Sequence, residues 1–226
     1  MRVTASRLMR PGTSALSDAM RKGGAMHREM QCRSAKAAMA GPAFTVRVHA
    51  ADILMIGPAL KECPKGHVLV IDGHGDLGTA LWGELTTYSA QGKGLAGVVI
   101  DGALRDSRQI RQCAFPVFAR AVVPNAGGAE YLGEIGVSVS CAGQVVRPGD
   151  WIVGDEDGVV VIPIESSESV LDIAERIVAA EKEIEKSIRA GVELADLIGT
   201  QAVIEQKRKG ILVPQLRGTI NAQVKT

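Results

Sequence analysis

Hydrophobic positions in this chain gather into short runs that glycine, proline and charged residues separate. Residues 41–50, GPAFTVRVHA, alternate apolar and polar positions as a half-buried strand does. Residues 67–72 and 95–101 are continuous apolar runs rich in β-branched side chains, which is typical of strands buried on both faces. Between these runs the sequence predicts a loop over 73–82 and a helix over 83–92 that ends at glycines. The pattern therefore predicts a strand–helix–strand unit in the middle of the chain.

The remaining elements are shorter, except for one long helix near the end. Residues 166–190 are predicted as that helix because apolar residues recur at helical spacing. The stripe consists of Val170, Ile173, Ile177, Ala180, Ile184 and Ile188. Shorter helices are expected at 14–23, where Ser14 caps the helix, at 52–62 and after Asp106. Further strands are expected at 116–121, 137–141, 144–146, 151–153 and 159–162. A turn at Asp157-Gly158 joins the last two strands. We expect one domain over residues 1–199 and an extended tail or subunit-exchanging oligomerisation arm over 200–226.

Composition and charge narrow the classes of function. With 46% hydrophobic residues among 226, the chain can bury one substantial core. Its 26 Lys and Arg nearly balance its 25 Asp and Glu, and aromatic residues make up only 3%, so we expect no nucleic-acid partner. The N-terminus shows no signal-peptide pattern, and no stretch approaches the roughly 18 consecutive apolar residues of a membrane span. We therefore expect a cytoplasmic protein with no membrane partner.

The cysteines and histidines are scattered along the sequence. The four cysteines form no C-x-x-C pair, and the four histidines form no H-x-x-x-H pair. Zinc sites usually have cysteine or histidine ligands close together in sequence. Disulfide-rich domains are usually smaller chains with a higher density of cysteines. We expect reduced thiols in the core and no zinc site.

The segment GHGDLG, residues 73–78, has the spacing of a dinucleotide-binding fingerprint and follows a predicted strand. Asp101 lies 23 residues after Gly78, near where a ribose-binding acid would fall. Against this reading, the Asp76 carboxylate would repel a pyrophosphate, and no second run of β–α–β units follows. We favour a wide turn whose glycines let other segments pass closely, and we keep an NAD-dependent enzyme as the less favoured alternative.

The stretch GELTT carries the first part of the candidate chemistry. If Gly83 opens a helix, the backbone N–H groups of Glu84, Leu85 and Thr86 are unpaired and form a site for a small carboxylate. This stretch adjoins Arg105 if the two central strands are neighbours in the sheet. The sequence therefore predicts an anion-binding corner where these strands end.

Arg105 and Asp106 carry the second part. An arginine can clamp a carboxylate in a bidentate way, and an aspartate offers a hard oxygen ligand. Proteins often hold Mg²⁺ with one carboxylate, waters and substrate oxygens. A purely structural interpretation stays open from spacing alone, because Asp106 and Gln109 can form a capping box while Glu84 favours the start of its helix.

Five segments in order carry a resemblance to a known family. They read GPAFTV, VLVIDGHGD, ALWGELTTYSAQGKGLAGVVIDGALRD, FPVFAR and RPGDWIVGDEDGVVVIP. Together they resemble the RraA-like family, which holds the class II 4-hydroxy-4-methyl-2-oxoglutarate/4-carboxy-4-hydroxy-2-oxoadipate aldolases and the regulator of ribonuclease activity A. The resemblance implies an α/β fold, a swivelling β/β/α domain with central mixed sheets, N-terminal helices and a long C-terminal helix. It also implies a homo-oligomer, trimer or hexamer, with active sites between subunits.

The family's aldolases carry an aspartate followed, after twenty residues, by Arg-Asp. Here the positions are Glu84, Arg105 and Asp106, so the first acid is one methylene longer. The resemblance implies that Arg105 binds substrate, that Asp106 binds a divalent metal, and that Gly83 to Thr86 hold the substrate carboxylate. Glu84 would hold a metal-bound water that carries a proton. A glutamate from a neighbouring subunit also approaches the metal waters in some members.

The implied activity is that of a lyase. Mg²⁺, or Mn²⁺ in its place, would stabilise the enolate left when a 4-hydroxy-2-oxo acid is cleaved to pyruvate. Oxaloacetate decarboxylation passes through the same enolate, so one site should run both reactions. No Schiff-base lysine is needed, and Lys93 reads as part of a solvated turn. The alternative from another class is a non-catalytic regulator that binds a ribonuclease or another protein through its outer surface.

Overall fold

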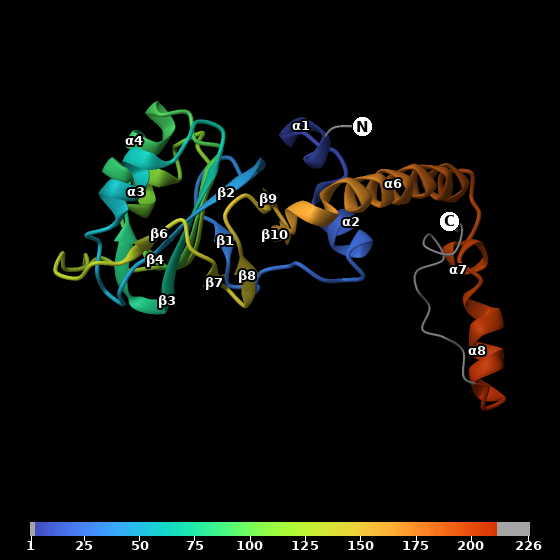
Figure 1. The fold of residues 1–226 in the computed structure, drawn as a ribbon. Helices are drawn as coiled ribbons and strands as arrows, with labels where there is room; N and C mark the ends of the chain where they lie inside the picture. Colours follow the sequence, from blue (N-terminus) through green and yellow to red (C-terminus); the bar gives the residue numbers. More distant parts are fainter. Residues whose placement is uncertain (1–2, 212–226) are drawn as a thin grey trace.

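The computed structural model describes residues 3–211 and is built around a mixed β-sheet (Figure 1). The strands are β1 (Gln31–Cys32), β2 (Met39–Arg47), β3 (Val68–Trp82), β4 (Gly97–Leu104), β5 (Val117–Val122), β6 (Glu134–Ile135), β7 (Val139–Cys141), β8 (Gln144–Val146), β9 (Trp151–Asp155) and β10 (Gly158–Ile162). The helices are α1 (Ala5–Leu8), α2 (Gly12–Ala19), α3 (Ile56–Glu62), α4 (Glu84–Gly92), α5 (Ser107–Ile110), α6 (Ser167–Arg189), α7 (Leu194–Leu197) and α8 (Thr200–Arg208). The predicted α/β class is confirmed.

The main sheet has the order β1-β5-β4-β3-β2-β9-β10, with β6 paired to β2 outside this path. Strands β2, β3, β4 and β5 are parallel, whereas β1, β9 and β10 pair antiparallel with their neighbours. The carboxyl ends of β3 and β4 therefore lie side by side at one edge of the sheet. The sheet is mixed, as the resemblance implied.

Alternate residues of the parallel strands face two separate cores. Leu69 and Ile71 of β3 face α3, α4 and α5 in one apolar cluster. Val68 and Val70 face the opposite side, where the β7–β8 hairpin and the β9–β10 hairpin close a second cluster. The parallel strands are thus covered on both faces, which explains why their sequences are continuously apolar.

A third core joins the N-terminal helices to the first half of α6. Helices α1 and α2 pack with β9, β10 and the first half of α6 through Leu8, Leu16, Ile162 and Leu171. Beyond Ile177 helix α6 extends away from the sheet, and α7 and α8 follow it (Figure 1). The predicted apolar stripe is therefore buried only in its first half, and Ile188 is 44% exposed.

Within the predicted extended tail or oligomerisation arm, residues 200–208 form helix α8. The last part of that predicted tail, residues 212–226, lies outside the described residues. Ser14 is also not the cap of the first predicted helix, because α2 begins at Gly12 and Ser14 lies inside it. Its hydroxyl instead donates to Asp157 Oδ2 at 2.8 Å.

The predicted loop over 73–82 is a continuation of β3. The strand keeps pairing with β4 through three register shifts, between Asp72 and Trp82. His74 and Gly75 have φ values of 57° and 69°, and they lie within the first of these irregularities, which does not end the strand. A Cβ on Gly73 would collide with Leu81. The expectation of close passage at these glycines is confirmed, but the wide turn is a bulged strand.

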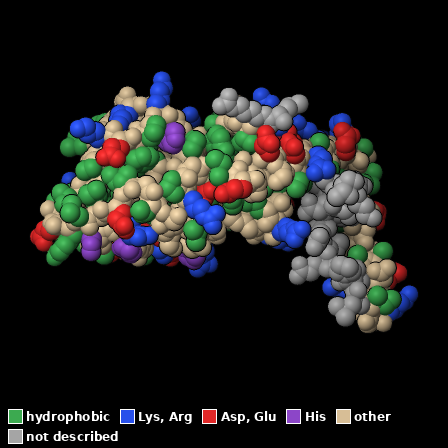
Figure 2. All heavy atoms as spheres, in the orientation of Figure 1, with side chains coloured by type: hydrophobic (Ala, Val, Ile, Leu, Met, Phe, Trp, Pro, Cys, Tyr) green, Lys and Arg blue, Asp and Glu red, His purple; other side chains and the backbone are tan. Residues whose placement is uncertain are grey.

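The surface mixes charges of both signs. Lysine and arginine side chains alternate with aspartate and glutamate across the face shown in Figure 2. Within residues 3–211, none of the helices has the length and apolar character that crossing a bilayer requires. All four cysteines are free thiols, and Cys63, Cys113 and Cys141 are buried.

Candidate functional site

The ends of β3 and β4 bring the two predicted motifs together. Trp82 and Leu104 are register partners, and the Arg105 N–H donates to the Trp82 carbonyl at 2.9 Å. Gly83 and Glu84 follow the first strand directly, as Arg105 follows the second. The prediction that these segments adjoin is confirmed, and they form one corner of the molecule, here called the open cluster: Gly83, Glu84, Arg105 and Asp106.

Asp106 stands before α5 in a backbone conformation that few side chains adopt. Its φ and ψ are 57° and 33°, in the left-handed region, and its side chain makes no capping hydrogen bond to α5. The carboxylate turns to the other motif, where Oδ2 accepts the Glu84 N–H at 3.1 Å and lies 3.7 Å from Arg105 Nε. The capping box with Gln109 is therefore not formed, and the carboxylate instead binds the first N–H group of α4.

Helix α4 begins at this corner and is held there by hydroxyl groups. Thr86 Oγ1 accepts the Gly83 N–H at 3.0 Å, and the buried Thr87 hydroxyl donates to the Gly83 carbonyl at 2.8 Å. The Trp82 indole donates to the same Thr87 oxygen at 2.8 Å. These bonds fix the first turn of α4 to the end of β3.

The predicted trio of unpaired amides is partly wrong. The Glu84 N–H is occupied by Asp106, which leaves those of Leu85 and Thr86 as first-turn donors with no carbonyl of their own helix to bind. N–H groups at the positive end of a helix dipole are chemically suited to a small anion. The Leu85 side chain beside it is 80% exposed.

Gly83 is required by space rather than by backbone conformation. Its φ of −160° is extended, which any residue adopts. A Cβ at this position would lie 2.6 Å from Asp106 Oδ2 and 3.4 Å from Arg105 Cγ. The absence of a side chain at Gly83 thus makes room for the Asp106 carboxylate.

Glu84 has a partner that sequence reasoning missed. The Tyr88 hydroxyl, one turn further along α4, donates to Glu84 Oε1 at 2.8 Å. This hydrogen bond raises the pKa of the Tyr88 phenol. Burial raises the pKa of the Cys113 thiol, and the charge of Glu84 adds to that rise. The four-residue spacing on a predicted helix was the signal that could have found this pair.

The open cluster offers few but suitable ligands for a hard cation. The Arg105 and Asp106 side chains are 45% and 38% exposed, and Asp106 Oδ1 has no hydrogen-bond partner within residues 3–211. The same residues contain no group of three or more His, Cys, Asp or Glu that could enclose a metal. A single open carboxylate fits a cation that keeps most of its waters, as Mg²⁺ does.

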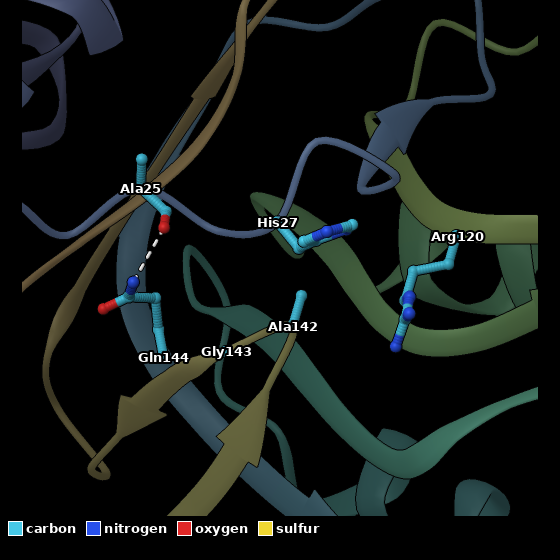
Figure 3. A pocket seen from close by; sticks show the side chains of 6 residues that line it. All are labelled: Ala25, His27, Arg120, Ala142, Gly143 and Gln144. Atoms are coloured by element: carbon cyan, nitrogen blue, oxygen red, sulfur yellow. Dashed lines mark hydrogen bonds between the residues drawn. The ribbon is translucent and has the colours of Figure 1, made fainter.

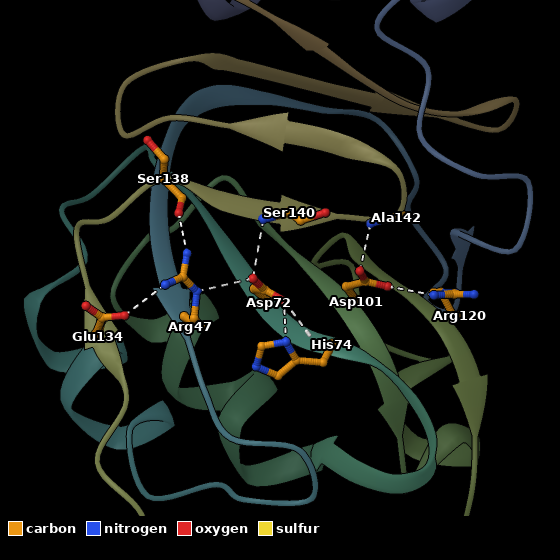
Figure 4. Close-up of polar contacts among 9 residues, drawn as sticks. All are labelled: Arg47, Asp72, His74, Asp101, Arg120, Glu134, Ser138, Ser140 and Ala142. Carbon is orange, nitrogen blue, oxygen red and sulfur yellow. Dashed lines mark hydrogen bonds and ion pairs between the residues drawn. The ribbon is translucent and has the colours of Figure 1, made fainter.

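A second set of charged side chains lies under the β7–β8 hairpin (Figure 4). We call Arg47, Asp72, Asp101 and Arg120 the closed cluster. Asp101 accepts Arg120 Nη1 at 3.0 Å and the Ala142 N–H at 2.8 Å. Both of its oxygens are used and the residue is 6% exposed, so it is not available to a ribose. With the glycines inside a strand, the dinucleotide reading has no support left.

A pocket of about 370 Å³ lies next to the closed cluster (Figure 3). It is lined by His27, Arg120 and the hairpin residues 142–144, together with Ala25, whose carbonyl accepts Gln144 Nε2 at 2.7 Å. Arg120 already binds Glu29 at 2.7 Å, and this bond lowers the pKa of Glu29. The pocket therefore presents no unpaired charge for a ligand.

Comparison with known proteins identifies related sequences. A family model described as RraA-like, Aldolase/RraA, matches residues 13–161, which contain the open cluster and end before α6. An uncharacterised protein of Methanocaldococcus jannaschii is 45% identical over 162 residues, 71% of this chain and 78% of that protein. The 4-hydroxy-4-methyl-2-oxoglutarate aldolase of Thermus thermophilus is 36% identical over 69% of this chain and 94% of its own length.

Solved structures agree with these sequence matches. The RNA-processing inhibitor RraA of Thermus thermophilus superposes with a TM-score of 0.62 at 33% identity, covering 72% of this chain and 94% of its own. An uncharacterised protein of Pseudomonas syringae pv. tomato superposes with a TM-score of 0.78 at 27% identity, covering 86% and 92%.

Proposed function

The chain belongs to the RraA-like family, and we propose that it is a class II aldolase that cleaves 4-hydroxy-2-oxo acids to pyruvate. The observation that carries the proposal is Asp106, whose left-handed backbone turns its carboxylate away from its own helix and toward Arg105. Strained residues of this kind cost about 1–3 kcal/mol and cluster at functional sites. The name of the Thermus relative, a 4-hydroxy-4-methyl-2-oxoglutarate aldolase, supports the same activity.

Substrate recognition follows from the charges of the open cluster. A 2-oxo acid places a carboxylate beside a keto oxygen. The N–H groups of Leu85 and Thr86 would bind the carboxylate, and the Arg105 guanidinium would contact the keto oxygen, where negative charge grows. Losing one preorganised donor of this kind often costs about 3–4 kcal/mol of barrier.

Asp106 is the residue that would hold a divalent cation, with waters and the two substrate oxygens as the other ligands. Mg²⁺ bound there would act as a Lewis acid toward the enolate that forms when the C3–C4 bond breaks. Mn²⁺ accepts the same oxygen ligands. Gly83 keeps the space in which the Asp106 carboxylate can reach such an ion.

Proton transfer is assigned to Glu84 through a water. The 4-hydroxyl must lose a proton as the bond to C3 breaks, and C3 must gain one to give pyruvate. Decarboxylation of oxaloacetate leaves the same enolate with CO₂ as the other product, so we include it as a second activity. Glu84 would hold the water that carries these protons.

No lysine is assigned to the chemistry. Lys93, the lysine nearest in sequence to the motifs, donates to the Leu60 carbonyl at 2.6 Å at the end of α3. Lys93 lies in the predicted turn after α4, but it is only partly exposed and its ammonium group is bonded to the end of another helix. This contact removes Lys93 from the candidates for a Schiff base.

We place the catalytic domain in residues 1–199 and propose that the protein is a homo-oligomer, trimer or hexamer, with its sites between subunits. The exposure of Leu85 beside the open cluster supports a covering subunit. A non-catalytic ribonuclease regulator, suggested by the name of the RraA neighbour, is our second candidate. A protein that acts through its outer surface alone would need neither the strained Asp106 nor the space at Gly83.

The test is pyruvate release from 4-hydroxy-4-methyl-2-oxoglutarate and from oxaloacetate, with Mg²⁺ and with EDTA. Oxaloacetate also decarboxylates in Mg²⁺ solution without enzyme, so Asp106→Ala at the same Mg²⁺ concentration is the matched control. We expect Mg²⁺-dependent release that the variant loses. A folded protein that releases no pyruvate above the control would contradict the proposal.

A further inference from the structure

Glu84 has a side chain one methylene longer than an aspartate would have at this position. A longer carboxylate has one more rotatable bond, and ordering it costs more side-chain entropy. Glu84 is also only half-buried, in the first turn of α4. A group that must hold a water in one place therefore needs something that fixes its side chain.

Tyr88 supplies that fixing contact. Its hydroxyl donates to Glu84 Oε1 at 2.8 Å from the next turn of the same helix. Within residues 3–211, the other oxygen, Oε2, accepts no hydrogen bond from the protein. One oxygen of the carboxylate is thus held and the other is open to a water.

The contact also fixes Glu84 relative to Asp106. The Glu84 N–H binds Asp106 Oδ2 at 3.1 Å, so the backbone of Glu84 is attached to that carboxylate. The hydrogen bond from Tyr88 then ties the Glu84 side chain to the same rigid helix. A phenol is a neutral donor near pH 7, so it orders the carboxylate without replacing its charge.

We propose that Tyr88 is a positioning residue that orients the Glu84 carboxylate for water-mediated proton transfer at the Arg105–Asp106 site. The inference rests on the proposed aldolase function. It explains how the long side chain of a glutamate can be kept in place in the first turn of α4: a tyrosine one helical turn away orders it.

The kinetic test is a double-mutant cycle on Mg²⁺-dependent pyruvate release. Tyr88→Phe removes only the hydroxyl, and we expect kcat to fall about tenfold, the lower end for a hydrogen bond to a charged group because Tyr88 is half-exposed, with KM nearly unchanged. In a Glu84→Ala background the same substitution should have no further effect. Tyr131→Phe, which alters the other tyrosine of the chain, should leave kcat unchanged.

A second measurement examines the contact without any substrate. In a Tyr131→Phe background Tyr88 is the only tyrosine, so its ionisation can be followed by ultraviolet absorbance. The pKa of Tyr88 should lie above its ordinary value near 10 and fall toward it when Glu84→Ala is added. An unchanged titration would show that the two side chains are not bonded and would overturn the proposal.

The outcomes separate this inference from the proposed function. Suppose that the wild-type protein releases pyruvate, but that Tyr88→Phe either keeps the wild-type kcat or lowers kcat by the same factor in the wild-type and Glu84→Ala backgrounds. The role of Tyr88 is then wrong, and the aldolase proposal is unaffected. If the wild-type protein releases no pyruvate, both proposals fall, and the titration shows whether the contact itself was correct.

Discussion

The open cluster and the closed cluster both combine arginine with carboxylates: Asp72 and Asp101 lie within β3 and β4, whereas the open cluster follows the ends of the same two strands. In the closed cluster, both oxygens of Asp101 accept hydrogen bonds, from Arg120 and from the Ala142 N–H, and its side chain is 9% exposed. In the open cluster, Asp106 is 38% exposed and has one oxygen without a protein partner within residues 3–211. The first arrangement uses both carboxylate oxygens, whereas the second leaves one oxygen open.

The backbone differs between them as well. Asp72 and Asp101 occupy regular register positions of paired strands, and their carboxylates attach the β7–β8 hairpin to the sheet through the Ser140 and Ala142 N–H groups. Asp106 instead adopts a left-handed conformation. Buried and fully paired charges indicate a structural role, whereas an exposed pair with a strained backbone indicates a site for a ligand.

The largest expected effect is that of Asp106→Asn on activity. Asparagine tolerates the left-handed region and keeps the shape of the side chain but loses its charge. We expect pyruvate release to fall on the order of a thousandfold, because a metal ligand and its charge are removed. The urea midpoint should stay near that of the wild-type protein. Retained activity would show that the open cluster is not the catalytic site.

Next in size is the effect of Asp101→Ala on stability. The substitution leaves the Ala142 N–H buried without a partner and removes one of the two carboxylates that bind Arg120. We expect a loss of about 2–4 kcal/mol in the free energy of unfolding. Urea titration followed by circular dichroism measures it. If Asp101→Ala lowered the free energy of unfolding less than Asp106→Asn does, the assignment of the two clusters would be reversed.

A smaller effect is expected for Gly83→Ala. The new methyl group would lie 2.6 Å from Asp106 Oδ2, so the carboxylate must rotate away. We expect kcat/KM to fall about tenfold to a hundredfold, since misplacement of about 1 Å can cost the larger factor. Stability should change little, because the backbone there is extended. Wild-type kinetics in this variant would mean that Asp106 need not occupy its observed position.

The smallest effect concerns Asp52, a buried carboxylate held by the backbone alone. The N–H groups of Glu130, Leu54 and Tyr131 lower its pKa from 3.8. A carboxyl group whose pKa is lower in the folded state than in the unfolded state stabilises the fold at any pH above its unfolded-state pKa. This stability is lost as the pH falls through the folded-state pKa. The stability difference between wild type and Asp52→Asn should therefore be full at pH 6 and shrink below pH of about 4. A difference that stays constant down to pH 2 would contradict this assignment.

The sequence predicted the corner of the site because that corner depends on local signals. Two continuous apolar runs joined by a helix predict parallel neighbours, and parallel neighbours place Gly83 beside Arg105. The helix start at Gly83 and the short helix after Asp106 follow from similar local patterns. These are the parts of the site for which neighbouring residues decide the structure.

What the sequence did not predict depends on distant partners. Residues 73–82 read as a loop from their glycines, yet pairing with β4 extends the strand to Trp82. The sequence predicts Asp106 as a helix cap. Its carboxylate instead binds the Glu84 N–H, in space that the missing side chain of Gly83 leaves free. Both outcomes are set by contacts across the sheet, which no local pattern contains.

The most direct test of the open cluster is a binding measurement with oxalate, a planar dianion shaped like the enolate of pyruvate. Isothermal titration calorimetry would follow oxalate binding to the wild-type protein and to Asp106→Asn, each with Mg²⁺ and with EDTA. We predict binding to the wild-type protein that requires Mg²⁺ and is at least about tenfold weaker in the variant, a difference of roughly 1.4 kcal/mol. Equal binding by both proteins, or binding that EDTA leaves unchanged, would contradict a metal-dependent 2-oxo acid site at Arg105 and Asp106.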